Sequence, residues 1–137
     1  MIVTLEQFQK QWSRKDCKTY ARDEDDGKAN TEMLIAYGKV HGIFFAAAEW
    51  CNAYCKNGVK PGEGFMPAKE QLKRIVTNRK IVNPALQKIG GIILDGWIWS
   101  SSEYDDSGVW DVLADNGAVD YSCKYHLYHY VRCVLAF

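Results

Sequence analysis

The sequence contains no apolar run near the roughly 20 residues that a membrane-spanning helix needs, and it has no excess of basic residues. Seventeen Lys and Arg residues balance seventeen Asp and Glu residues, which argues against a general nucleic-acid binder. Residues 1–10 lack the basic-then-apolar pattern of a signal peptide, so they predict no secretory export. With 137 residues, 47% of them hydrophobic, the chain is expected to fold as one domain with its own core.

The sequence also lacks the side-chain sets that common metal and catalytic sites need. The acidic residues 23–26 do not have the alternating spacing of a calcium loop, so residues 22–30 are predicted to form a solvated loop. The Ser run at 100–102 has no assignable His and Asp partners. Glu103 is expected to satisfy buried polar groups rather than to act as a catalytic acid.

An odd number of cysteines in a chain without a visible signal peptide predicts reduced, buried thiols. The five cysteines and three histidines do not form a four-ligand zinc set. The cysteines are Cys17, Cys51, Cys55, Cys123 and Cys133.

Helical signals dominate the first two thirds of the chain. A capping-box pattern at residues 4–7, followed by Leu5, Phe8 and Trp12, predicts a helix over 4–14. An apolar stripe predicts a helix over 43–55, and Pro67 fits the first turn of another over 67–78. Two further predictions are a strand over 33–40 and a short helix that Asn83-Pro84 begins and Ile89 ends.

After Asp95 the pattern changes to that of a small antiparallel sheet. Strands are predicted over 97–101, 109–114, 118–123 and 128–137, and Asp115-Asn116-Gly117 is a hairpin turn signal. Trp97, Trp99 and Trp110 are expected in the core. The whole chain is therefore predicted to be α+β, with N-terminal helices packed on a small twisted antiparallel sheet.

The last third of the chain also differs in composition. Residues 95–137 carry seven acids and two bases, whereas residues 1–94 carry ten acids and fifteen bases. Glu, Gln, Lys, Met and Trp together occur thirty times in residues 1–103, but only twice in residues 105–130, as Trp110 and Lys124. Strands and turns disfavour Glu and Lys, which explains part of this difference. The remaining Tyr, Ser, Asn and Asp residues are typical of binding loops.

Several segments resemble the C-terminal part of variable proteins made by diversity-generating retroelements. They are Gly-Trp-Ile-Trp-Ser-Ser-Ser-Glu-Tyr at 96–104, Val109-Trp110, Asn116-Gly117, Lys124 and Tyr-Val-Arg-Cys-Val-Leu-Ala-Phe at 130–137. Residues 48–51 and 64–72 resemble the preceding helix and loop of the same fold. The resemblance covers residues 43–137, and the chain departs from it at Cys133, where proline is usual.

The resemblance implies a single C-type-lectin-like domain over 1–137, of the class related to the formylglycine-generating enzyme. Residues 1–42 have no assigned role, and residues 95–137 are the ligand-binding variable region. In this family a reverse transcriptase randomises adenines of a template, so that AAC codons become NNC codons. NNC codons cannot encode Glu, Gln, Lys, Met or Trp, the five types that are scarce in residues 105–130.

The resemblance also divides the tail into framework and variable positions. The expected framework residues are Trp110, Val112, Gly117, Val119, Lys124, Tyr130 and Arg132. The expected variable, ligand-binding residues are Asp105, Asp106, Asp111, Leu113, Asp115, Asn116, Ala118, Asp120, Tyr121, Ser122, Cys123, Tyr125, His126, Leu127, Tyr128 and His129. Tyr121, Tyr125 and Tyr128 are expected to form an exposed platform, and the histidines to be contact residues rather than metal ligands.

The predicted function is non-enzymatic binding of a protein or cell-surface ligand, with no catalytic residue, cofactor or metal. Neither nucleic-acid binding nor membrane insertion is expected. The expected partners are a second copy of the chain or a phage or surface structure to which the domain docks. The location would be a phage tail or a cell surface reached by an unseen export route. Two alternatives stay open: an oxidase like the formylglycine-generating enzyme, and a lectin-like structural domain without diversification.

The diversification hypothesis makes a prediction about the gene. The codons of the proposed variable positions should end in C, and a near-copy of this region should lie downstream beside a reverse-transcriptase gene. Sequencing the locus checks both points. Variable-position codons with other third bases, and no neighbouring repeat, would contradict the hypothesis.

Overall fold

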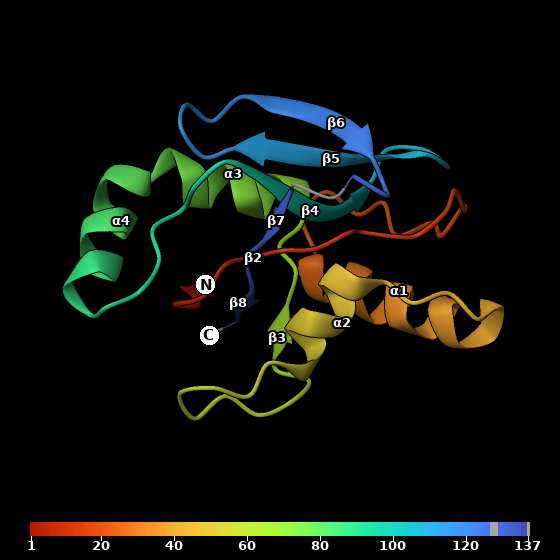
Figure 1. The fold of residues 1–137 in the computed structure, drawn as a ribbon, viewed down its shortest axis with the longest axis horizontal. Helices are drawn as coiled ribbons and strands as arrows, with labels where there is room; N and C mark the ends of the chain where they lie inside the picture. The colour runs from red at the N-terminus through yellow and green to blue at the C-terminus, as the bar shows by residue number, and fades with distance from the viewer. Residues whose placement is uncertain (127–128, 137) are drawn as a thin grey trace.

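The computed structural model describes residues 1–126 and 129–136, and these residues form four helices and two β-sheets. The predicted α+β class is thus confirmed. Figure 1 shows α1 and α2 on one side of the central strands, and α3, α4 and the β5–β6 hairpin on the other. The helices are α1 (Gly27–His41), α2 (Ala46–Ala53), α3 (Lys69–Thr77) and α4 (Arg79–Lys88).

The larger sheet has five strands in the order β2-β7-β4-β5-β6. Its strands are β2 (Phe8–Gln9), β7 (Tyr130–Val131), β4 (Trp97–Glu103), β5 (Gly108–Leu113) and β6 (Val119–Cys123). Strands β4, β5 and β6 follow one another as antiparallel neighbours, as the alternation and the turn at 115–117 predict, whereas β4 and β7 are parallel.

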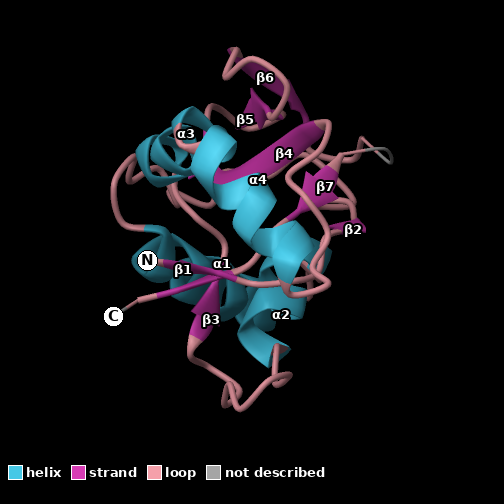
Figure 2. Ribbon diagram, turned by 90° about the vertical axis from the view of Figure 1, so that its left-hand side faces the viewer, coloured by secondary structure: helices cyan, strands magenta, loops and turns pink. Residues whose placement is uncertain are grey.

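The smaller sheet joins the two ends of the chain. It has the order β1-β8-β3, with β1 (Ile2–Val3), β8 (Val134–Leu135) and β3 (Gly64–Phe65). Ile2 lies opposite Leu135, so the first and last described segments lie side by side (Figure 2). No helix in these described ranges is long and apolar enough to cross a membrane.

The helix predicted over residues 4–14 is wrong, because this segment is extended and binds the C-terminal part of the chain. The N–H of Thr4 donates to the Cys133 carbonyl, that of Lys10 to His129, and that of Trp12 to Lys124. The Trp12 side chain is fully buried, and its Nε1 donates to the Ser100 carbonyl at 3.0 Å. Tertiary hydrogen bonds therefore replace the local bonds that the capping-box pattern predicted.

The strand predicted over 33–40 is also wrong, because these residues belong to α1. The predicted loop ends earlier than 30, since Asp26 caps the helix by accepting from the N–H of Ala29 at 3.0 Å. Leu34 and Gly38 lie one turn apart and are both buried. A Cβ at Gly38 would lie 2.3 Å from the Ile43 carbonyl oxygen, so this glycine permits the close turn into α2.

The remaining predictions differ from the structure mainly in their bounds. The helices predicted over 43–55 and 67–78 are present as α2 and α3, but α4 begins at Arg79 and contains Pro84 inside it. The terminal strand predicted over 128–137 is divided into β7 and β8. Its end residues Tyr128 and Phe137 lie outside the described residues.

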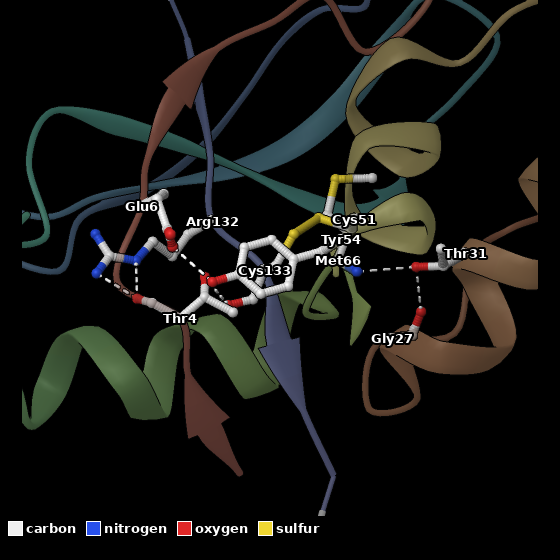
Figure 3. Close-up of a disulfide and its surroundings, with 9 residues drawn as sticks. All are labelled: Thr4, Glu6, Gly27, Thr31, Cys51, Tyr54, Met66, Arg132 and Cys133. Carbon is white, nitrogen blue, oxygen red and sulfur yellow. Dashed lines mark hydrogen bonds between the residues drawn. A yellow bond between two sulfur atoms is a disulfide. The ribbon is translucent and has the colours of Figure 1, made fainter. Parts of the chain in front are cut away.

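The expectation that all five thiols are reduced is wrong, because Cys51 and Cys133 form a disulfide. Their Cα atoms lie 5.3 Å apart, and both residues are fully buried. Figure 3 shows the bond between α2 and the residue that follows Arg132. Cys133 therefore fastens the C-terminal segment to α2. Cys17, Cys55 and Cys123 are free thiols.

The core consists of two clusters of buried side chains on either side of the larger sheet. One contains Trp12, Phe45 and Trp99 together with the disulfide, and the other contains Val76 of α3 and Val112 of β5. The sheet is thus supported on one face by α1 and α2 and on the other face by α3.

We expect removal of the disulfide to destabilise the protein. The Cys133→Ala variant should lose about 2–4 kcal/mol of unfolding free energy, since the bond closes a loop across most of the chain. Urea unfolding measures this loss. In the protein without the substitution, unfolded in the absence of reductant, thiol counting should find three free thiols. The matched control Cys55→Ala, at an exposed free thiol, should change stability by less than about 0.5 kcal/mol. Five reactive thiols in the unfolded, non-reduced chain would contradict the disulfide.

Candidate ligand-binding face

The β5–β6 hairpin presents two faces that follow from its register. Trp110 lies opposite Tyr121, and Asp111 lies opposite Asp120. Because cross-strand partners share a face and successive residues alternate, Trp110 and Tyr121 lie on one face and Asp111 and Asp120 on the other. On the first face Val112 packs into the cluster that α3 completes. The hairpin therefore has a supported end near α3 and an open end near Tyr121.

An aromatic cluster of Tyr104, Trp110 and Tyr121 covers the open end of the first face. The Tyr104 and Tyr121 rings stack with their centroids 4.0 Å apart, and Trp110 meets them edge-on at 4.9 and 5.9 Å. The Lys69 ammonium lies 4.1 Å from the centre of the Trp110 ring and 3.0 Å from Glu24. These contacts hold the rings in place, so a ligand would meet a preorganised surface.

The expected burial of the three tryptophans is confirmed for Trp99 only, which is completely enclosed. Trp97 and Trp110 are half-buried and belong to neither core cluster. The alternation that predicted a strand was right, but α3 extends over only part of the face that carries Trp110. This ring is therefore part of the aromatic cluster instead of the core.

A hollow of about 330 Å³ lies beside the aromatic cluster. It is lined by Asp105, Ser107, Gly108, Tyr121, Ser122, Cys123 and Tyr125. Tyr121 and Tyr125 are 50% and 47% exposed, which confirms that both tyrosines lie at the surface. Asp105 fixes one wall, because its Oδ1 accepts from the N–H groups of Ser107 at 3.0 Å and Gly108 at 2.7 Å. A ligand here would meet aromatic rings, a carboxylate and a thiol.

Beneath the opposite face, Asp111 and His129 form a buried pair. His129 Nε2 lies 2.7 Å from Oδ2 of Asp111, and the Ser122 hydroxyl donates to the same oxygen at 2.5 Å. The His129 ring stacks on Trp99 with centroids 4.4 Å apart. Both residues are predicted variable positions, yet their side chains are buried in the protein.

The hairpin is anchored by a buried ion pair between Glu103 and Lys124. Lys124 Nζ lies 3.0 Å from Glu103 Oε2, and both side chains have no exposed surface. Glu103 also accepts from the Thr19 N–H and from Arg22 Nε, while Lys124 donates to the Cys17 carbonyl. Glu103 thus satisfies buried polar groups, as expected from the sequence. Burial alone would raise the pKa of Glu103, but the hydrogen bonds from Thr19 and Lys124 outweigh it and lower the pKa.

A second buried cation, Arg132, ties the C-terminal segment to the N-terminal one. Its Nε donates to the Thr4 carbonyl at 2.9 Å (Figure 3), and its Nη1 lies 3.4 Å from Oε1 of Gln7. Burial lowers the pKa of Arg132 to about 10. The two expected framework cations, Lys124 and Arg132, are therefore both interior and fully engaged.

The predicted variable positions divide into four groups by their surroundings. The exposed ones are Asp105, Asp106, Asp115, Asn116, Ala118, Asp120, Tyr121, Tyr125 and His126. Leu113, Ser122 and Cys123 are half-buried, and Asp111 and His129 are buried. Leu127 and Tyr128 lie outside the described residues. The tip of the hairpin, at Asp115 and Asn116, is separate from the hollow.

Two residues of this face were missed from the sequence. Tyr104 is exposed and stacks on Tyr121, and Lys69 of α3 lies over Trp110. The sequence did carry a signal for Tyr104, because it directly precedes the first predicted variable residue. No sequence signal pointed to Lys69, which is 41 positions before Trp110. Within the described ranges, no three His, Cys, Asp or Glu side chains gather in a way that could hold a metal ion.

A solved structure with the same fold is that of a fimbrial protein from Bacteroides ovatus. It matches 98% of this chain with a TM-score of 0.75 and 15% sequence identity. The matched part is 35% of that protein, so the chain corresponds to about a third of its length. At this identity the likeness shows a shared fold alone. No protein-family model and no curated protein matches the sequence.

We expect the Glu103→Gln variant to lose about 3 kcal/mol of unfolding free energy, because it leaves the buried Lys124 ammonium without a counter-charge. Urea unfolding at neutral pH measures the loss. The matched control is Glu70→Gln, which removes a partly exposed pair with Lys73 and should change stability by less than about 1 kcal/mol.

The lowered pKa of Glu103 also predicts an acid dependence of stability. The unfolded state takes up a proton near the ordinary pKa of 4.5, whereas the folded state does so only at lower pH. The stabilisation by Glu103 is therefore complete above pH 4.5 and is lost as the pH falls through the folded pKa. Equal acid dependence in the native protein and in Glu103→Gln would contradict this assignment.

Proposed function

We propose that this chain is a non-enzymatic ligand-binding module whose binding face is diversified by adenine-directed retroelement mutagenesis. One observation carries the proposal. Of the positions that codon randomisation would change, nine are exposed and gather on the β5–β6 hairpin and its flanking turns. The framework residues Val112, Lys124 and Arg132 are buried in the same segment. Side chains at the exposed positions can thus be exchanged without disturbing the core.

The scaffold we propose is the C-type-lectin-like fold of the variable proteins that the tail resembles. The paired chain ends, the helices α1 and α2, and the sheet with an exposed β5–β6 hairpin are compatible with that fold. Two of the framework residues, Lys124 and Arg132, make buried contacts to distant segments, and the disulfide of Cys133, which follows Arg132, fixes the same part of the chain to α2. The residues of the binding face can then change in sequence while the framework residues beneath them keep the same fold.

We propose that the domain works at a cell or virion surface. The Cys51–Cys133 disulfide supports an oxidising environment, and the solved structure of like fold is described as fimbrial. Because this chain corresponds to about a third of that protein, its place in a surface assembly would depend on parts beyond the shared fold. A phage tail remains the other location that the resemblance implies.

An oxidase function of the formylglycine-generating type has less support. That chemistry uses a cysteine pair, and here Cys51 and Cys133 are fully buried in the core. Cys123 lines the hollow, but the other free thiols, Cys17 and Cys55, do not. The hollow therefore offers one thiol without a partner cysteine in its lining.

The chemistry of the face favours a partner with basic side chains. Asp105 lines the hollow with both tyrosines, Asp106 follows it and is exposed, and Asp120 is exposed on the other face of the hairpin. The segment 95–137 carries five more acids than bases. Exposed aromatic rings supply affinity and accept cations on their faces, while the carboxylates select positive charge. We propose a basic segment of a protein surface as the ligand class.

We expect the Tyr121→Ala and Tyr125→Ala variants to fold normally and to lose binding. Selection of a displayed library of random peptides against the native protein should enrich basic sequences. Each variant should bind those peptides about tenfold or more weakly, the scale of an interface hot spot.

The matched control is Phe44→Ala, because Phe44 is an exposed aromatic residue before α2 and outside the hollow lining. It should bind the selected peptides like the native protein. Circular dichroism and urea unfolding establish folding of all three variants. Enrichment without basic bias, or equal loss in Phe44→Ala, would contradict the proposal.

A further inference from the structure

Strand β6 is the longest open sheet edge in the described part of the chain. The five-stranded sheet ends at β2 on one side and at β6 on the other, and the smaller sheet ends at β1 and β3. Each of β1, β2 and β3 has two residues, whereas β6 has five. Figures 1 and 2 show β6 at the outer limit of the molecule, with β5 as its neighbour. Its backbone is therefore long enough to pair with another strand.

The hydrogen bonds at the two ends of the hairpin fix which residues of β6 bond to β5. Near the turn, the Leu113 N–H donates to the Ala118 carbonyl at 2.8 Å, and at the far end the Lys124 N–H donates to the Ser107 carbonyl at 2.9 Å. In an antiparallel pair, residue pairs that exchange hydrogen bonds alternate with pairs that do not. The even-numbered residues of β6 therefore bond to β5, and the odd-numbered ones direct their N–H and C=O groups away from it.

The odd-numbered residues of β6 are Val119, Tyr121 and Cys123. The Tyr121 N–H donates to Asp120 Oδ1 at 2.8 Å, and the Cys123 carbonyl accepts from the His126 N–H at 3.0 Å. In the described ranges no hydrogen bond reaches the N–H and C=O of Val119, the Tyr121 carbonyl or the Cys123 N–H. Unpaired backbone groups along a strand edge are a template for an added strand.

A carboxylate lies beside this edge. The Asp120 side chain is exposed, and its bond to the Tyr121 N–H brings Oδ1 to the outward side of the strand. Asp105 lines the hollow next to Tyr121, and the segment 95–137 carries five more acids than bases. An incoming strand would therefore meet negative charge, which favours a strand that carries Lys or Arg.

The same carboxylate argues against a second copy of this chain as the occupant of the edge. Two β6 strands that paired with each other would bring two Asp120 side chains to one seam. Like charges that face each other across paired strands are destabilising, and charged side chains are a common means of preventing edge-to-edge association. The edge is therefore unfavourable for self-pairing and favourable for a strand of opposite charge.

We propose that the outer edge of β6 binds an extended, basic segment of the partner protein as an added β-strand. Main-chain hydrogen bonds to Val119, Tyr121 and Cys123 hold the segment, Asp120 selects its charge, and its alternate side chains lie over the hollow. This docking mode rests on the proposed function and adds to it the conformation of the ligand. Because main-chain bonds do not depend on side-chain identity, they would persist when the variable positions change.

The added strand is tested with N-methylated copies of a basic peptide that has been enriched against the native protein. N-methylation removes one backbone donor and keeps every side chain. Successive N–H groups of a strand point to opposite sides, so methylation should weaken binding about tenfold or more at alternate positions and much less at those between them. Isothermal titration calorimetry measures each affinity. Equal tolerance at all positions, or loss without this period of two, would overturn the added strand.

Amide hydrogen exchange, followed residue by residue by NMR, locates the strand on the protein. In the saturated complex, the Val119 and Cys123 amides should exchange at least tenfold more slowly than in the free protein, because peptide carbonyls accept from them. The control is the Val3 amide on the open edge of β1, whose exchange should not change. Peptide binding without slower exchange at Val119 would overturn the site.

Charge selection is tested with Asp120→Asn, whose amide oxygen can still accept from the Tyr121 N–H. This variant should bind the enriched peptide about fivefold more weakly at low salt, and the difference should shrink in about 1 M salt, where charges are screened within about 3 Å. Equal affinity of the variant and the native protein at low salt would overturn the role of Asp120.

The matched control for this substitution is Glu63→Gln. It removes one exposed charge from the loop between α2 and β3, which lies at the opposite end of the molecule from β6 (Figure 1). It should bind the peptide like the native protein at both salt concentrations.

The outcomes distinguish failure of the added strand from failure of the proposed function. Basic peptides that are enriched, tolerate N-methylation throughout and leave Val119 unprotected would overturn the added strand alone. Failure to enrich any basic peptide would overturn both proposals. A concentration-dependent dimer of the ligand-free protein in analytical ultracentrifugation, with a protected Val119 amide, would assign the edge to a second copy and overturn the proposed occupant.

Discussion

The buried ion pair of Glu103 and Lys124 is the interaction on which the arrangement of this domain depends. Glu103 ends β4 and Lys124 follows β6, so the pair joins the first and last strands of the β4–β5–β6 sheet. The Lys124 carbonyl accepts from the N–H groups of Trp12 and Ser13, and Glu103 accepts from Thr19. Two charges without water contact require all of these partners at once, which holds the N-terminal segment against the sheet.

This support explains how a surface can vary while the fold stays constant. Stability resides in the disulfide, the two buried cations and the core clusters, and none of these uses an exposed variable position. In the aromatic cluster, a predicted framework residue and a predicted variable residue are in direct contact, since the rings of Trp110 and Tyr121 meet edge to face. A fixed ring thus holds an exchangeable one in a defined place. Asp111 and His129 are the exceptions, as buried variable positions whose polar atoms must satisfy one another.

The fold was predictable where local pattern and tertiary environment agree. The hairpin from β5 to β6 follows from alternation and a turn signal, and α2 and α3 follow from apolar stripes, because those elements bury one face each. The prediction was wrong for residues 4–14, where helical spacing of Leu5, Phe8 and Trp12 occurs in an extended segment. It was also wrong for residues 33–40, where Leu34 and Gly38 are buried at helical spacing that β-branched neighbours obscured. For residues 4–14 the deciding contacts are hydrogen bonds to residues far away in the sequence, whereas the helix over 33–40 begins at the local cap of Asp26.

The sequence by itself determined the α+β class, the hairpin, the acidic composition of the tail and the exposure of Tyr121 and Tyr125. These properties depend on alternation, turn residues and charge, which are local. Only the tertiary structure decided that Cys51 pairs with Cys133, that Tyr104 and Lys69 belong to the face, and that Asp111 and His129 lie inside it. Such contacts join residues that are tens of positions apart, and their pairing is set by how the helices and the two chain ends pack around the sheet, which no local pattern encodes.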